Sequence, residues 1–232
     1  MHGPPKRSNR ALLVPYLLPY LLYTGFAFIP PAWLSREINY AARLAATAVA
    51  LVWAWRRYVP LRGPYPAAAS MAVGAAAGLA GTALWVALVN PFVESGGEAW
   101  SALAFWLRVA AAASVVPLFE ELLMRGYVLR LVVQWERARH AGIPNAFAQA
   151  LDRRSISEVE PGAWSPLAVL IATGVFALGH SSAEWTAAVA YGLLMAGLWI
   201  LRKDLLSCVT AHVATNLGLA LYVRVTGHWA LW

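Results

Sequence analysis

The chain has 232 residues, of which 60% are hydrophobic and only 12% are charged. A soluble domain of this size needs charged side chains over most of its surface, and this composition excludes such a domain. The formal net charge of +7 is typical of Lys and Arg that flank membrane helices, so we expect no nucleic acid partner. The single cysteine, Cys208, excludes an intramolecular disulfide and a zinc site built on several thiolates.

Taken in chain order, the apolar runs predict an all-α membrane bundle of seven or eight transmembrane helices, because a crossing needs about 20 mostly apolar residues. The first run, Ala11 to Pro31, is too long for a signal-peptide core, and we expect it to be a retained span. In the third run, small residues from Ala72 to Gly81 favour close helix packing. The expected spans are Ala11–Ile29, Tyr40–Trp55, Ala67–Val89, Ser101–Val116, Leu118–Val133, Ser165–His180, Glu184–Leu201 and Leu205–Val225.

The fourth and fifth runs decide the number of spans, because they form either one helix kinked near Pro117 or two separate helices. Arginines place the amino terminus and the second loop in the cytoplasm: Arg7, Arg10, Arg56, Arg57 and Arg62. If Ser101–Val133 is one span, the polar stretch Glu136–Gly162 is also cytoplasmic, as the charge rule prefers. We therefore favour seven spans.

We expect a single integral membrane domain over residues 1–232, with its chemical motifs in 101–225. The longest polar stretch, residues 136–162, carries too many charges to lie in lipid. We expect it to form a partly helical loop over the bundle.

Ionisable side chains at membrane depth are costly and are therefore candidates for function. Glu121 and Arg125 are four residues apart, share one face of a helix and can pair. Glu120 lies about 100° further round that helix and cannot share the pairing face. His180 has Phe176 four residues before it, where the phenyl ring would pack beside the imidazole. The last pair, His212 and Asn216, presents two hydrogen-bonding groups on one face; the three motifs are Glu120–Arg125, Phe176–His180 and His212–Asn216.

These residue types suit hydrolysis of an amide. A carboxylate such as Glu120 beside an imidazole such as His180 can hold and deprotonate a water molecule. A second imidazole and an amide, His212 and Asn216, can donate hydrogen bonds to the oxygen that becomes negative when water attacks a carbonyl. The set would form a hydrolase without a nucleophilic Ser or Cys.

Three alternatives stay open on the residues alone. Polar side chains in membranes often only hold helices together. A Glu/His/His set can also bind zinc or iron, although the sequence contains no HExxH and offers one ligand per helix. Carboxylates and imidazoles also mark paths for protons or ions in transporters.

Three other charged residues carry weaker expectations. Glu184 follows His180 by four residues and would orient it if the helix continued. Arg108 lies in an apolar run, and we expect it to pair with an acid or to extend to a membrane interface. Arg43 lies near a span end, and we expect it to extend to a membrane interface.

The three motifs read EExxxR, FxxxH and HxxxN in this order, with Pro117 before the first. This arrangement resembles the CAAX protease and bacteriocin-processing family of intramembrane glutamic-type endopeptidases. Further stretches are similar to a subgroup of CAAX prenyl protease-related proteins of bacteria with exosortase and PEP-CTERM sorting systems: Glu184-Trp185, Ala190–Leu194, His212–Leu217 and Thr226–Trp232.

The resemblance implies that Glu120 and His180 activate the water, and that His212 and Asn216 form the oxyanion site. The supporting residues would be Glu121, Arg125 and Phe176. It implies no metal and no other cofactor. For this mechanism the four catalytic side chains must lie at the same depth in the membrane. The expected spans alone do not place them at the same depth.

The same resemblance implies a multi-pass protein of the bacterial inner (cytoplasmic) membrane, surrounded by the lipid bilayer. Its partner would be a protein or peptide substrate with a C-terminal sorting or membrane-proximal segment. The alternative is a non-catalytic membrane accessory protein of an export or sorting system.

Overall fold

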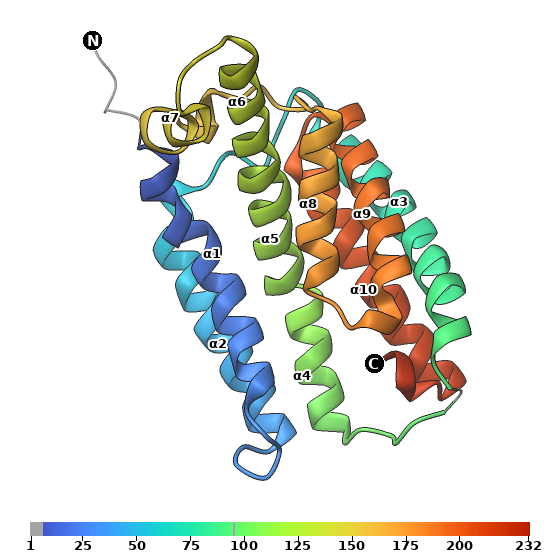
Figure 1. Ribbon diagram of the computed structural model, residues 1–232. Coiled ribbons are helices and arrows are strands. Elements are labelled where there is room, and N and C mark those ends of the chain that lie inside the picture. Colours follow the sequence, from blue (N-terminus) through green and yellow to red (C-terminus); the bar gives the residue numbers. More distant parts are fainter. Residues whose placement is uncertain (1–6, 95) are drawn as a thin grey trace.

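The computed structural model describes residues 7–94 and 96–232, and within them the secondary structure is helical and contains no strand. This confirms the all-α class. Figure 1 shows the helices as a bundle in which most axes run roughly along one direction. The helices are α1 (Asn9–Gly25), α2 (Arg36–Ala54), α3 (Ala67–Val89), α4 (Ala102–Ala112), α5 (Val115–Glu121), α6 (Leu129–His140), α7 (Ala146–Arg153), α8 (Pro166–Leu178), α9 (Trp185–Arg202) and α10 (Leu205–Thr226).

Five helical segments among the described residues are long and apolar enough to cross a bilayer. The chain is therefore a multi-pass membrane protein, whereas the expected number of seven or eight spans stays a prediction. The five segments are Asn9–Phe28, Ala67–Phe92, Ala102–His140, Ser182–Arg202 and Leu205–Thr226.

The fourth and fifth expected spans belong to one helical run of 39 residues, Ala102–His140. The run is interrupted at Ala113 and Ser114, one turn before Pro117. Pro117 is the third residue of α5, where a backbone N–H would have no helical partner, so the ring is tolerated without a further kink. Between α5 and α6 the chain forms a π-helical segment, Leu122–Val128. Such segments occur frequently at functional sites.

Because α4, α5 and α6 continue one another, residues 136–162 lie at the same end of the bundle as the start of α1 (Figure 1). Buried Asn9 joins these parts, since its side chain donates to Gln134 Oε1 at 2.7 Å and to the Ala150 carbonyl at 2.8 Å. Nearby, Arg10 forms an ion pair with Asp152, and this hydrogen bond holds the pKa of the Asp152 carboxyl below its usual value. The polar stretch, which includes α7, therefore covers this end of α1.

The closest helix packing joins α3 to α10. A Cβ at Gly74 would lie 2.5 Å from the Ser207 carbonyl oxygen, and one at Gly78 would lie 2.3 Å from that of Ala211. Only glycine permits these approaches, which confirms the expectation of close packing by small residues in the third span. The contact fixes the part of α10 that carries the next residue, His212.

The shortness of α8 settles the question of depth. Its 13 residues span about 20 Å, whereas the hydrocarbon core of a bilayer is about 30 Å thick. Figure 1 shows α8 ending partway along the bundle, where a turn leads into α9. His180 lies two residues after the end of α8, and its side chain is partly buried.

Candidate active site

Glu121 and Arg125 form a buried ion pair, as their spacing predicts. Arg125 Nη1 lies 3.2 Å from Glu121 Oε2, and both side chains are at most 1% exposed. The second guanidinium nitrogen donates to the Gly192 carbonyl at 3.0 Å. Arg125 therefore balances the charge of Glu121 and ties the π-helical segment to α9.

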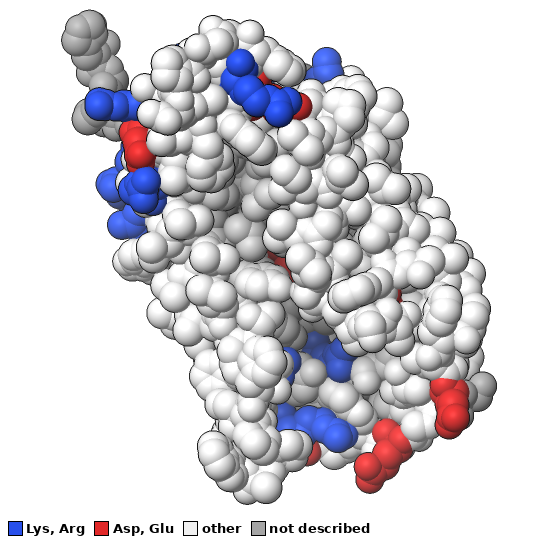
Figure 2. Space-filling model, viewed as in Figure 1, with Lys and Arg blue, Asp and Glu red and all other residues white. Residues whose placement is uncertain are grey.

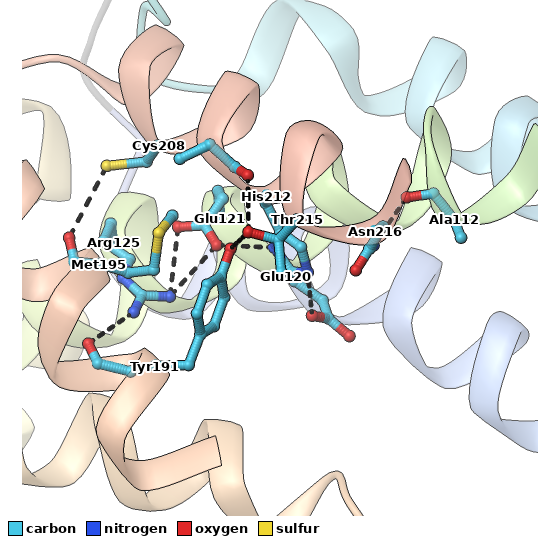
Figure 3. Close-up of polar contacts among 12 residues, drawn as sticks. Ala112, Glu120, Glu121, Arg125, Tyr191, Met195, Cys208, His212, Thr215 and Asn216 are labelled. Carbon is cyan, nitrogen blue, oxygen red and sulfur yellow. Dashed lines mark hydrogen bonds and ion pairs between the residues drawn. The ribbon is translucent and has the colours of Figure 1, made fainter. Parts of the chain in front are cut away.

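His212 lies between the two glutamates, as Figure 3 shows. Its Nδ1 is 3.0 Å from Glu121 Oε1, and its Nε2 is 3.6 Å from Glu120 Oε2. The sequence placed His212 on a face with Asn216 but gave no sign of the contact with Glu121. The His212 imidazole therefore contacts both Glu121, which Arg125 neutralises, and Glu120, which has no arginine partner among the described residues.

A cavity of about 310 Å³ brings together all four residues predicted to be catalytic: Glu120, His180, His212 and Asn216. This is within the size range of small-molecule sites, about 300–1,000 Å³. Figure 2 shows a hollow in the lower half of the visible face, with basic side chains inside it.

The orientation of His180 is fixed by the end of α8. Its Nδ1 lies 2.9 Å from the Phe176 carbonyl oxygen, and because a carbonyl only accepts, Nδ1 carries the hydrogen. The neutral ring then has its lone pair on Nε2. Trp85 and Phe176 hold the imidazole from two sides, with ring centroids at 5.2 and 4.6 Å.

Phe176 packs beside His180, as its spacing predicts, and also lies near His212. Its ring lies 4.6 Å from His180 and 6.2 Å from His212, between centroids. The Arg125 guanidinium carbon lies 5.8 Å from the same ring. Phe176 therefore provides an apolar wall between the Glu121–Arg125 pair and the cavity.

Glu184 does not orient His180, because the helix that would align them ends at Leu178. Its carboxylate instead accepts hydrogen bonds from the Ser181 backbone N–H at 3.0 Å and hydroxyl at 2.6 Å. This forms a capping box that starts the return towards α9.

Asn216 makes a structural hydrogen bond that the sequence did not predict. Its side-chain nitrogen donates to the Ala112 carbonyl at 2.7 Å (Figure 3). That carbonyl lies at the break between α4 and α5, where helical partners are missing. One of the two Asn216 N–H groups is therefore committed to the fold, which leaves one for a ligand.

Sequence reasoning missed two polar residues that support His212. The Tyr191 hydroxyl donates to Thr215 Oγ1 at 3.1 Å, and the Tyr191 ring packs edge-on to His212 at 5.6 Å. Thr215 Oγ1 in turn donates to the Gly78 carbonyl at 2.9 Å. A signal was present, because Thr215 lies within the His212–Asn216 motif and Tyr191 within the stretch Ala190–Leu194.

Arg108 does not pair with an acid among the described residues, and the expectation that Arg43 or Arg108 extends to a membrane interface stays a prediction. Both side chains line the same cavity as Glu120. Among residues 7–94 and 96–232, neither guanidinium forms an ion pair with a carboxylate. They lie instead against aromatic rings.

The described part of the chain contains no group of three or more His, Cys, Asp or Glu side chains placed to hold a metal ion. Within the candidate site, His212 is held by two carboxylates and His180 by a carbonyl and two rings.

Fold and site together define a multi-pass membrane protein that holds acidic, imidazole and amide side chains in one internal cavity. The family described as Type II CAAX prenyl endopeptidase Rce1-like matches residues 101–218, about half of the sequence, and the chain belongs to this family of intramembrane endopeptidases. The matched region contains all seven residues predicted for the site. No curated protein and no solved structure matches the chain.

Proposed function

We propose that this protein is a glutamic-type intramembrane endopeptidase that uses water activated by Glu120 and His180 and needs no metal. One observation carries the proposal: Glu120 faces a cavity shared with His180, His212 and Asn216, whereas its neighbour Glu121 is balanced by Arg125. Two adjacent glutamates therefore have different surroundings and different tasks.

The first chemical step is attack by water. The Glu120 carboxylate takes a proton from a water that also donates to the His180 Nε2 lone pair. The water oxygen forms a bond to the peptide carbonyl carbon, and the π electrons of the carbonyl move to its oxygen. Held in place, such a base contributes about 10²- to 10⁴-fold to the rate.

The second step is the collapse of the tetrahedral intermediate. His212 lies between two carboxylates, of which Arg125 balances one, so a doubly protonated His212 would make the cluster neutral. Its Nε2–H and the free N–H of Asn216 would then donate to the oxyanion. As the carbonyl re-forms, the C–N bond breaks and protonated Glu120 returns its proton to the leaving nitrogen.

The position of the cavity bears on how substrate enters. Its lining includes Thr24 at the end of α1, Ala27 just beyond it, and Trp232 at the carboxyl end of the chain. These lie at the end of the bundle opposite the basic residues of the amino terminus (Figure 1). If the basic end is cytoplasmic, as the charge rule predicts, substrate enters from outside the inner membrane of a bacterium.

The substrate that fits this site is a protein segment next to or inside the membrane. Exposed leucine and tryptophan side chains surround the bundle, so the enzyme and its substrate would share the lipid phase. The subgroup resemblance makes a C-terminal sorting segment the first substrate to test.

The experiment uses the purified full chain in liposomes and a library of proteome-derived hydrophobic peptides read by mass spectrometry. Glu120→Gln, His180→Ala and His212→Ala are each expected to abolish cleavage, while Glu98→Gln, a change at an exposed acid outside the cavity, retains it. A chelator is expected to leave cleavage unchanged. Full cleavage by Glu120→Gln would remove the proposed base.

Thermal unfolding of the same variants separates catalysis from helix clamping. A catalytic carboxylate in a buried site often costs stability, so Glu120→Gln is expected to unfold at the same temperature as the unaltered chain or higher. A non-catalytic accessory protein that uses these residues as clamps would instead lose stability with each substitution and cleave nothing.

A further inference from the structure

We propose that a second, basic cavity, at the end of the bundle where α1 begins, binds the phosphate group of an anionic lipid. Its volume is about 210 Å³. Sites for drug-sized molecules have about 300–1,000 Å³, so this smaller space suits a headgroup phosphate. The lining residues on which the proposal rests are Arg62, Arg130, Ser157, Trp199, Lys203 and Asp204.

Three packed loops form most of the wall of this cavity. They join α2 to α3, α7 to α8 and α9 to α10, and these helix ends lie at one end of the bundle (Figure 1). A Cβ at Gly63 would lie 2.2 Å from the Lys203 carbonyl oxygen, and the Leu206 N–H donates to the Leu61 carbonyl at 2.9 Å. A Cβ at Gly162, in the loop before α8, would lie 2.5 Å from the Lys203 Cγ. The loops therefore hold one another in place around Lys203.

Arg130 is a buried cation in the cavity wall, only 4% exposed. Its Nη1 donates to the carbonyls of Ile156 and Val159 at 3.2 and 2.9 Å, and its guanidinium carbon lies 5.0 Å from the centre of the Trp199 ring. Its Nε is buried without a hydrogen-bond partner. Carbonyls and a ring support the guanidinium group but do not balance its charge. Such a buried cation is costly unless an anion approaches it.

Two exposed cations, Arg62 and Lys203, add to the charge of the cavity. Within the described ranges neither of them, nor Arg130, forms an ion pair with a carboxylate. Asp204 also lines the cavity, but its carboxylate caps α10 by accepting from the Ser207 N–H at 2.6 Å, and it accepts from the Ser70 hydroxyl at 2.8 Å. Three cations and one carboxylate leave the lining with a net charge of +2.

Exposed aromatic side chains place this cavity at the level of the lipid headgroups. Tyr65 and Trp164 lie two residues before the starts of α3 and α8, and they are 42% and 52% exposed. Tyrosine and tryptophan are enriched where membrane helices meet water. Phosphate groups are the anions at this level, and basic pockets between membrane helices bind phosphate-bearing headgroups. Arginine and lysine both bind phosphate, which makes an anionic lipid the occupant that fits the charge and the position.

The test measures lipid binding to the purified full chain in detergent by native mass spectrometry. Phosphatidylglycerol is the anionic probe, and phosphatidylcholine, whose choline cation cancels the phosphate charge, is the comparison. We expect one phosphatidylglycerol to be retained per chain and to bind at least about fivefold more tightly than phosphatidylcholine, because each cation near the membrane surface contributes about that factor. Added phosphatidylglycerol should also raise the unfolding temperature, since a ligand that binds only the folded chain stabilises it.

Variants assign the lipid to this cavity. Arg62→Gln and Lys203→Gln should each weaken the binding of phosphatidylglycerol about fivefold, and the double variant should lose the preference over phosphatidylcholine. Arg139→Gln is the matched control, because Arg139 is an exposed arginine of α6 that stacks on Trp135 at 5.8 Å but does not line the cavity. It should keep the full preference. Arg130→Gln also removes two buried hydrogen bonds, so the assignment rests on the two exposed cations.

Two results would overturn the lipid site: equal retention of both lipids by the unaltered chain, or equal weakening of phosphatidylglycerol binding by Arg139→Gln and Lys203→Gln. The second result would mean that the basic surface attracts the lipid only in general. Inorganic phosphate is the third arm of the experiment. If it raises the unfolding temperature as much as the lipid does, and Lys203→Gln removes that effect, the lipid is overturned as the source of the phosphate group. Peptide cleavage does not enter this test, so its outcome is independent of the proposed function.

Discussion

The two sides of the cavity are built by different means. On the α3–α10 side, glycines bring backbones into contact: Gly78 meets Ala211, and Thr215 donates to the Gly78 carbonyl. On the α2–α4 side, the wall consists of large side chains, with Arg43 and Arg108 stacked against Tyr40. The first side holds His212 in a fixed position, and the second presents charges that no carboxylate of the described residues balances.

This difference matches two separate requirements of the proposed reaction. Groups that act on the transition state have to be held within a fraction of an ångström, which backbone packing and buried hydrogen bonds provide. Groups that receive a substrate must keep unsatisfied capacity until the substrate arrives. In the proposed reaction, the rigid side would therefore carry the chemistry and the aromatic side would face the substrate.

Asn216 contacts the break between α4 and α5 from α10, and its replacement should have the largest effect among the substitutions that test this comparison. Asn216→Ala removes one oxyanion donor and the bond to the Ala112 carbonyl. We expect kcat to fall about 10²- to 10³-fold and the free energy of unfolding to fall by about 1 kcal/mol. Kinetics with a cleaved peptide and thermal unfolding measure the two losses.

The control for Asn216 is Ser114→Ala at the same helix break, where the Ser114 hydroxyl donates to the Ala110 carbonyl outside the cavity. It should lower stability slightly and leave kcat unchanged. If both variants lose activity equally, Asn216 acts only by holding the break together.

Gly78→Ala tests the rigid side itself. The added Cβ would approach the Ala211 carbonyl oxygen at 2.3 Å, so α3 and α10 must separate. Overpacking of this kind costs about 1–3 kcal/mol, and the shift would displace His212. We expect a lower unfolding temperature together with loss of cleavage. Normal activity in a destabilised Gly78→Ala would show that the position of His212 does not depend on this contact.

Helix periodicity predicted the features that depend on neighbours along one helix. The i,i+4 spacing placed Glu121 against Arg125, and the run of small residues indicated the close packing of α3. The separate surroundings of Glu120 follow from the same geometry, because adjacent residues on a helix point about 100° apart. The catalytic roles stay predictions.

Features that depend on depth and on other helices could not be predicted in this way. Nothing in the run from Ser165 to His180 shows that α8 stops partway along the bundle, because termination there depends on the turn and the capping box of Glu184. The stacking of Arg43 and Arg108 on Tyr40 was not predicted, because a single sequence does not reveal which aromatic rings surround a side chain. The contact of His212 with Glu121 likewise joins residues 91 positions apart.

A smaller effect of opposite sign is expected at Gly197 in α9, where an added Cβ has no neighbour within 4 Å. Gly197→Ala should raise the free energy of unfolding by about 0.5–1 kcal/mol, because alanine loses less backbone freedom in a helix. Activity should be unchanged. Destabilisation by Gly197→Ala, measured by thermal unfolding beside Gly78→Ala, would contradict the open space that the structure shows beside Gly197.

The smallest effect is expected furthest from the cavity, at the exposed pair of Arg10 and Asp152. Arg10 lowers the pKa of the folded Asp152 carboxyl, so the pair stabilises the fold above the usual pKa of Asp and loses this contribution as the pH falls through the lowered value. Asp152→Asn should therefore lower the unfolding temperature slightly at pH 7, and the difference from the unaltered chain should shrink as the medium is acidified. Cleavage at pH 7 should be the same for both, since exposed ion pairs contribute little and this one only attaches α7 to α1. An unfolding difference that stayed constant into strong acid would assign the effect to packing of the side chain and not to its charge.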